Sequence, residues 1–203
     1  TYLGQIEAGL ARSGYARPLF LMQSGGGVIA APAARAAPVR LAESGPVGGA
    51  LASRALAETA GYMDAIAFDM GGTTAKTCLI AGGEMPVTRA YEVDRVHRFK
   101  KGSGTPIAVP TVDLIEIGAG GGSFASVDTL GLIQIGPESA AADPGPACYG
   151  RGGTRATVTD ANVLLGYLDP SDFLAGAMQL DIQAAKDAIA CDVGKPLGMT
   201  PIE

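Results

Sequence analysis

The residues best suited to chemistry lie in one short stretch, in which an acid ends an apolar run and a polar turn follows. After the apolar residues 65–68 come Asp69, Gly71, Gly72, Thr73 and Thr74. A carboxylate at the tip of a buried strand is costly unless it serves a cation or a hydrogen bond. Glycines let backbone N–H groups come close to a ligand, and hydroxyls add donors. An acid beside such a turn suits magnesium and a phosphate group, so we predict catalytic and metal-binding roles for Asp69 and cofactor binding by the turn.

The same spacing allows a simpler interpretation. Gly-Gly-Thr between two strands can be an ordinary hairpin, and the apolar run before Asp69 is what favours the ligand-binding interpretation. A Walker-type phosphate loop is excluded, because that loop has Gly-x-x-x-x-Gly-Lys-Ser/Thr at the start of a helix. Here a strand is expected to leave the turn.

A second glycine-rich segment, residues 118–122, follows the apolar run 109–117. Four glycines in five residues at a strand end indicate close backbone approach to a phosphate, a substrate carboxylate or a neighbouring helix. Gly120 and Gly121 are therefore predicted to bind the cofactor. Asp113 precedes this segment as Asp69 precedes its own turn, which makes Asp113 the second metal candidate. A strand-edge charge or a turn-capping acid explains Asp113 equally well.

Three further polar residues have plainer interpretations. His97, the one histidine, lies among arginines and lysines, which predicts a solvated face. Cys148 has no sequence neighbour that would activate it, so a buried anchor is favoured over a nucleophile. Asp160 precedes the helical run 161–168 and is expected to cap it.

The pattern of apolar residues predicts an α/β fold with a mixed sheet, a β-meander and flanking helices. Residues 1–62 form a helical and strand segment leading into a core domain at 63–203, in which residues 136–153 form a long Gly/Pro-rich loop. The expected helices are 2–10, 47–60, 161–168 and 182–189, and the expected strands include 19–22, the two arms of the central hairpin, 87–93 as the third meander strand, 109–117, 123–127 and 132–135.

Composition excludes several classes of protein. The 203 residues are 47% hydrophobic and 17% charged, with a net charge of -5 and no long basic cluster, so no nucleic-acid partner is expected. No apolar run is long enough for a membrane span. The three cysteines lack Cys-x-x-Cys spacing, which favours buried reduced thiols in a cytoplasmic protein over zinc binding.

Several blocks together resemble the hydantoinase A/5-oxoprolinase family of the actin-like ATPase superfamily, whose domains are ribonuclease H-like. This family also includes subunits of acetone and acetophenone carboxylases. The blocks are Phe-Asp-Met-Gly-Gly-Thr-Thr at 68–74, Ser-Gly-Pro-Val-Gly-Gly at 44–49, Ile-Gly-Ala-Gly-Gly-Gly-Ser at 117–123, the Gly/Pro-rich segment 136–150 and Thr-Val-Thr-Asp-Ala-Asn at 157–162.

The resemblance implies an ATP-dependent hydrolase acting on cyclic amides, or a carboxylase subunit. ATP with Mg²⁺ or another divalent metal would activate a cyclic amide or ketone, and a hydantoinase B-type subunit would be the partner. The family's other nucleotide-binding motifs are absent here, so we expect an internal fragment of a larger subunit that is inactive alone. Lys76 stands where the family more often has an acid. A non-catalytic nucleotide-binding scaffold and a sugar-kinase-like phosphotransferase are the alternatives.

Overall fold

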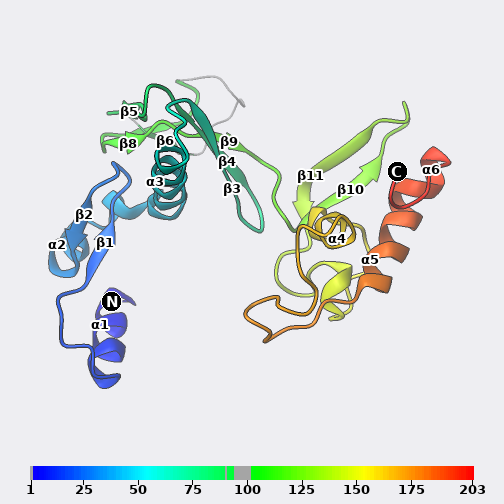
Figure 1. The fold of residues 1–203 in the computed structure, drawn as a ribbon, viewed down its shortest axis with the longest axis horizontal. Coiled ribbons are helices and arrows are strands. Elements are labelled where there is room, and N and C mark those ends of the chain that lie inside the picture. Colours follow the sequence, from blue (N-terminus) through cyan, green and yellow to red (C-terminus); the bar gives the residue numbers. More distant parts are fainter. Residues whose placement is uncertain (1, 90, 94–101) are drawn as a thin grey trace. The chain divides into compact units, whose positions relative to one another are not determined.

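The computed structural model describes residues 2–89, 91–93 and 102–203, which form two compact units. The first unit consists of Thr1–Asp69 and Lys76–Ile115, and the second of Met70–Ala75 and Glu116–Glu203 (Figure 1). The tip of the central hairpin therefore belongs to the second unit. The domain boundary expected at residue 62 does not coincide with the border of these units and stays a prediction.

The first unit is built around one long helix packed on two strands. Figure 1 shows helix α3 beside strands β3 and β4. Val47 and Ala50 of α3 share one hydrophobic core with Ala67 of β3 and Cys78 of β4. Its elements are α1 (Tyr2–Arg12), β1 (Phe20–Met22), β2 (Val28–Ala30), α2 (Ala31–Ala36), η1 (Pro38–Leu41), α3 (Ser44–Thr59), β3 (Ala65–Met70), β4 (Ala75–Ile80), β5 (Val87–Thr88), β6 (Tyr91–Val93), β7 (Thr105–Ile107), β8 (Thr111–Val112) and β9 (Ile115–Ile117).

The predicted α/β class is confirmed, but the described strands form several small sheets and the predicted third strand of the meander is wrong. The sheet order is β3-β4-β9, and the expected strand 87–93 is divided into β5 and β6. These halves cannot form one strand of the hairpin's sheet because β5 pairs with β8 and β6 pairs with β7, both antiparallel. The run 109–117 is likewise two strands, β8 and β9. Pro110 has no N–H for a strand ladder, so β8 begins only after it.

The second unit packs two helices and a 3₁₀ turn against a hairpin (Figure 1). Strands β10 and β11 pair antiparallel, with Val127 opposite Ile133 and a bulge between Ser123 and Ala125. The loop expected from Gly136 begins later, because β11 continues to Ser139. The elements are β10 (Ser123–Val127), β11 (Ile133–Ser139), η2 (Ala147–Tyr149), α4 (Val158–Leu164), α5 (Ile182–Ile189), η3 (Ala190–Gly194) and α6 (Lys195–Leu197).

The residue that caps the start of α4 differs from the one expected from the sequence. Thr157, not Asp160, is the N-cap residue, because its backbone is extended and its side chain accepts from the Asp160 amide. Asp160 lies three residues later and accepts from the Thr157 amide, which completes a capping box. The helix therefore begins at Val158, three residues earlier than expected.

Other sequence expectations are confirmed within the described residues. Helix α5 follows the capping side chain of Asp181, and β10 has the expected bounds. The thiols of Cys78 and Cys148 are buried, whereas Cys191 is exposed, contrary to expectation. In the part of the chain that the structure describes, no helix is both long enough and apolar enough to cross a lipid bilayer.

Candidate functional site

The turn between β3 and β4 is an exposed hairpin end in which some backbone N–H groups have no hydrogen-bond acceptor among the described residues. The Gly71 N–H donates to the Thr74 carbonyl oxygen at 2.9 Å, which closes the turn. Gly71, Gly72 and Thr73 are exposed. Within the described residues, the N–H groups of Gly72 and Thr73 donate to no acceptor. Free, exposed amides at successive residues are suited to bind an anion.

The two glycines of this turn are not required by the fold itself. Neither has a positive φ. A Cβ built at Gly72 would meet nothing within 4 Å, and one at Gly71 would make only an ordinary contact at 3.6 Å with the Thr74 carbonyl oxygen. The absence of side chains here leaves open space beside the free amides.

Asp69 lies one residue before the end of β3, near the strand tip where the sequence predicts it, and its side chain is half-buried. Its Oδ2 would lie 3.1 Å from a Cβ placed on Gly49 of α3, so glycine makes room for the carboxylate. No hydrogen bond or ion pair engages the Asp69 carboxylate among the residues that the structure describes. Because α3 begins at Ser44, the amides of Gly48 and Gly49 lie beyond its first turn and serve the helix. Gly49 therefore permits close packing and does not face an anion.

The second glycine segment contacts the turn directly. A Cβ on Gly120 would lie 2.6 Å from backbone atoms of Thr73 and Thr74, closer than real contacts allow. The Gly121 N–H donates to the Gly71 carbonyl oxygen at 2.8 Å, and the Gly122 N–H donates to that of Gly72 at 2.7 Å. The close backbone approach predicted for this segment is thus an approach to the turn. A direct role of Gly120 and Gly121 in cofactor binding stays a prediction.

Asp113 lies in a different setting, beside the core of the first unit. Its N–H donates to the Pro86 carbonyl oxygen at 2.8 Å. Burial raises the pKa of the Cys78 thiol, and the negative charge of Asp113 raises it further. The described residues contain no group of three or more His, Cys, Asp or Glu side chains arranged to hold a metal. The metal-binding role of Asp113 stays a prediction.

Sequence reasoning missed an ion pair that involves Lys76. Its Nζ lies 3.7 Å from Oε2 of Glu43, and both side chains are largely buried. The Tyr91 hydroxyl also donates to Glu43. The charge of Lys76, which stands where the family more often has an acid, is therefore matched by the acid Glu43. The one available signal was an acid directly before the Ser-Gly-Pro start of α3.

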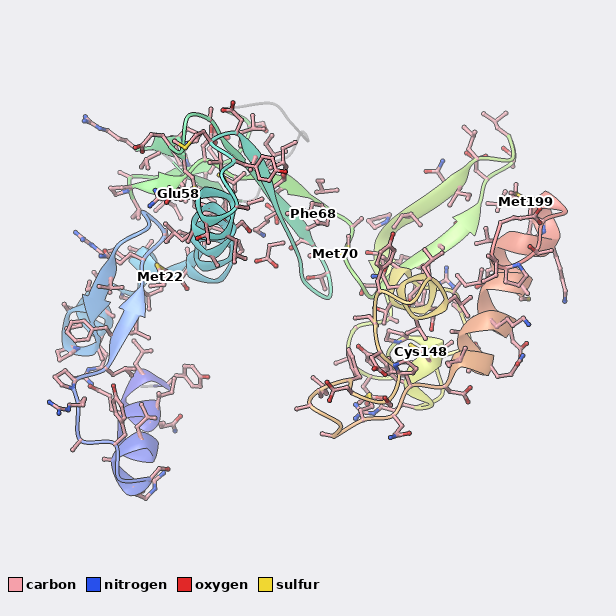
Figure 2. The ribbon with its side chains drawn as sticks, in the orientation of Figure 1. Met22, Glu58, Phe68, Met70, Cys148 and Met199 are labelled. Carbon is pink, nitrogen blue, oxygen red and sulfur yellow. The ribbon has the colours of Figure 1, made fainter. Side chains whose placement is uncertain are left out.

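Cys148 lies within the packed interior of the second unit (Figure 2). Burial raises the pKa of its thiol far above the ordinary value, and the neighbouring Asp160 raises it further. A protonated thiol is a poor nucleophile, so the anchoring interpretation holds. Tyr149 also anchors the loop through a ring contact with Phe173 at 5.6 Å between centroids. The prediction for His97 lies outside the described residues.

Asp160 is the buried hub of the 136–153 loop, a role that sequence reasoning did not foresee. Its carboxylate accepts from the amides of Cys148 at 2.8 Å and Ala147 at 3.3 Å. It also accepts from the Thr157 amide at 2.9 Å and the Thr157 hydroxyl at 2.7 Å. The loop is therefore held by one carboxylate at the start of α4.

The chain resembles known proteins along its whole length. The hydantoinase/oxoprolinase family model matches residues 1–203. Caprolactamase subunit alpha of Pseudomonas jessenii is 38% identical over 199 residues, 98% of this chain and 27% of that protein. The nucleotide-free structure of acetone carboxylase, solved to explain ATP-dependent acetone carboxylation, matches with a TM-score of 0.74 and 32% identity over 98% of this chain and 27% of that one. The crystal structure of the ATP-dependent caprolactamase of Pseudomonas jessenii matches with a TM-score of 0.65 and 36% identity. The match covers 99% of this chain and 28% of that one. This chain thus spans about a quarter of the length of these relatives.

Proposed function

The chain belongs to the hydantoinase/oxoprolinase family, and from this premise we propose that it forms part of the nucleotide site of an ATP-dependent subunit. The observation that carries the proposal is the hairpin turn, where the amides of Gly72 and Thr73 are exposed and have no acceptor in the described part of the chain. The hydroxyls of Thr73 and Thr74 would add donors for the terminal phosphates of ATP.

The residues at the end of β3 fit a divalent metal accompanying the nucleotide. Asp69 is a half-buried carboxylate that no described cation or donor engages, so its oxygens are available to a ligand. We assign it to the water shell of Mg²⁺ or another divalent ion, where the metal would neutralise phosphate charge. Asp113 is the weaker metal candidate because it lies against the core. The turn amides would orient and grip the phosphate, which is most of what phosphoryl transfer requires of a protein.

The activities named for the relatives support a proposal about the substrate class. ATP would phosphorylate the oxygen of a cyclic amide, an imide or an enolate, with ADP as the leaving group, and so activate it for hydrolysis or carboxylation. The named relatives act on a lactam and a ketone with ATP. One of them is a named subunit, which supports a second subunit as partner here, and we propose one of the hydantoinase B type.

Two other functions fit the turn less well. A non-catalytic nucleotide-binding scaffold needs the amides but not an unengaged acid such as Asp69. A sugar-kinase-like phosphotransferase needs a substrate-binding acid, and none of the described residues supports that role.

A panel assay tests the proposal. The complete subunit and its partner are incubated with ATP and each of hydantoin, 5-oxoproline, caprolactam, and acetone with bicarbonate. We expect ATP hydrolysis to rise with one member of the panel. ATP binding without turnover on any substrate would favour the scaffold, and transfer of phosphate to a sugar would favour the kinase.

A further inference from the structure

Helix α4 is connected to the hairpin turn by a short series of hydrogen bonds, all within the second unit. Thr159 donates twice to the Gly121 carbonyl oxygen, from its N–H at 2.8 Å and from its hydroxyl at 2.8 Å. Gly121 in turn donates its N–H to the Gly71 carbonyl oxygen at 2.8 Å. The Thr159 amide belongs to the first turn of α4, where N–H groups have no partner within the helix. The glycine segment supplies that partner.

These bonds decide which way the amides of the turn point. The peptide bonds of the turn are trans, so each carbonyl and the following N–H point in opposite directions. The carbonyls of Gly71 and Gly72 both point at the glycine segment, where they accept from Gly121 and Gly122. The N–H groups of Gly72 and Thr73 must then point away from that segment. This agrees with the exposure of both residues and with their free amides among the described residues.

We propose that Thr159 is a positioning residue for phosphate binding: by fixing Gly121 it holds the Gly71–Gly72 peptide with its N–H directed outward. This inference rests on the proposed function of the turn. The Gly121 carbonyl oxygen accepts from Thr159, and the Gly121 N–H donates to Gly71 of the turn. Gly121 therefore couples the position of α4 to the orientation of the turn amides. A Cβ on Gly121 would lie 2.8 Å from the Thr159 hydroxyl oxygen, so no larger residue fits between them without moving that hydroxyl. Thr159 does not itself touch the nucleotide in this proposal.

The test compares Thr159→Val with Thr159→Ser in the complete subunit with its partner. Valine keeps the shape but removes the hydroxyl donor, whereas serine keeps the donor. We expect Thr159→Val to raise the KM for ATP about five-fold, the ratio carried by one ordinary hydrogen bond, with kcat little changed. Thr159→Ser should retain most of the wild-type affinity. Amide hydrogen exchange over residues 70–75 without nucleotide should quicken in the valine variant only.

The outcomes separate this inference from the proposed function. An unchanged KM for ATP in Thr159→Val, or a fall in kcat alone, overturns the positioning role. If Thr159→Val does not fold, Gly121→Ala replaces it and should raise the KM in the same way; an unchanged KM there overturns the inference. Gly72→Ala serves as the reference for the turn. If the KM for ATP rises in Gly72→Ala but not in Thr159→Val, the proposed function stands and the positioning role of Thr159 is wrong. If the KM changes in neither variant, both the proposed function and the positioning role are contradicted.

Discussion

The two glycine segments, Gly71–Gly72 and Gly120–Gly122, have the same composition but different physical reasons for it. In the first, an added Cβ would meet open space or an ordinary contact. In the second, an added Cβ would come within 2.6 to 2.8 Å of the turn backbone or of neighbouring hydroxyls. Neither segment has a positive φ that would demand glycine. The fold therefore explains the second segment completely and the first not at all.

This difference assigns a role to each segment. Glycines that packing requires are structural, and here they hold the turn against α4. Glycines that packing does not require keep space free, and here that space lies beside unengaged amides. Gly71 follows Asp69 by two residues in the sequence. The comparison predicts that changes in the supporting segment lower stability and weaken nucleotide binding together, whereas changes in the turn and at Asp69 affect nucleotide chemistry without a loss of stability.

The largest effect is expected at Asp69. Asp69→Asn keeps the shape but removes the negative charge, and we expect ATP turnover by the complete subunit to fall about 100-fold or more, the scale of losing one electrostatic contact to the transition state. The thermal unfolding midpoint should stay near that of the wild type, because no described partner holds the carboxylate. Wild-type turnover in this variant would remove the catalytic assignment.

The second largest effect is expected at Asp160, the buried carboxylate that binds the amides of the 136–153 loop. Asp160→Ala leaves four buried donors without their acceptor, which should lower the free energy of unfolding by about 3 kcal/mol or more in denaturant titration. Asp181→Ala is the matched control. It removes one exposed helix cap and should cost about 1 kcal/mol. An equal loss of unfolding free energy in the two variants would show that Asp160 contributes no more than an ordinary helix cap.

The supporting glycines are expected to show a smaller loss of stability. Gly120→Ala forces the turn backbone to move and should cost about 2 kcal/mol of unfolding free energy, with weaker ATP binding as a consequence. Gly48→Ala, in the interior of α3 with nothing within 4 Å of its Cβ, should instead stabilise by about 0.5–1 kcal/mol. Stability in Gly120→Ala equal to the wild type would mean that the two glycine segments do not differ.

The smallest effect concerns the reactivity of the three cysteine thiols. With the native protein at pH 8, iodoacetamide should label the exposed Cys191 and leave Cys78 and Cys148 unlabelled until unfolding. Because the pKa of the Cys148 thiol is raised on folding, its contribution to stability is present below the unfolded thiol pKa of about 8.5 and is lost as the pH rises above it. Rapid labelling of native Cys148 would indicate a reactive site where we place a structural one.

Local patterns were predictable from the sequence, whereas pairings between distant residues were not. The hairpin, α3 and α5 follow from apolar periodicity and from capping residues. The division of 87–93 between two partner strands, the Glu43–Lys76 pair and the contacts of Thr159 join residues far apart in the chain. Their side chains carry no signal of which distant partner they meet. Asp160 was recognised as part of the helix start, but its bonds to the loop depend on how that loop folds back.

The most direct measurement of the central claim is a calorimetric titration of ATP with Mg²⁺ into the complete subunit carrying Gly72→Ala. The Cβ has open space in the fold, so the unfolding midpoint should be no lower than that of the wild type. The methyl group would stand where phosphate oxygens approach the turn, and we predict a dissociation constant at least about ten-fold higher, roughly 1.4 kcal/mol. Gly48→Ala should bind as the wild type does. A dissociation constant for Gly72→Ala equal to that of the wild type would contradict the assignment of this turn to the nucleotide.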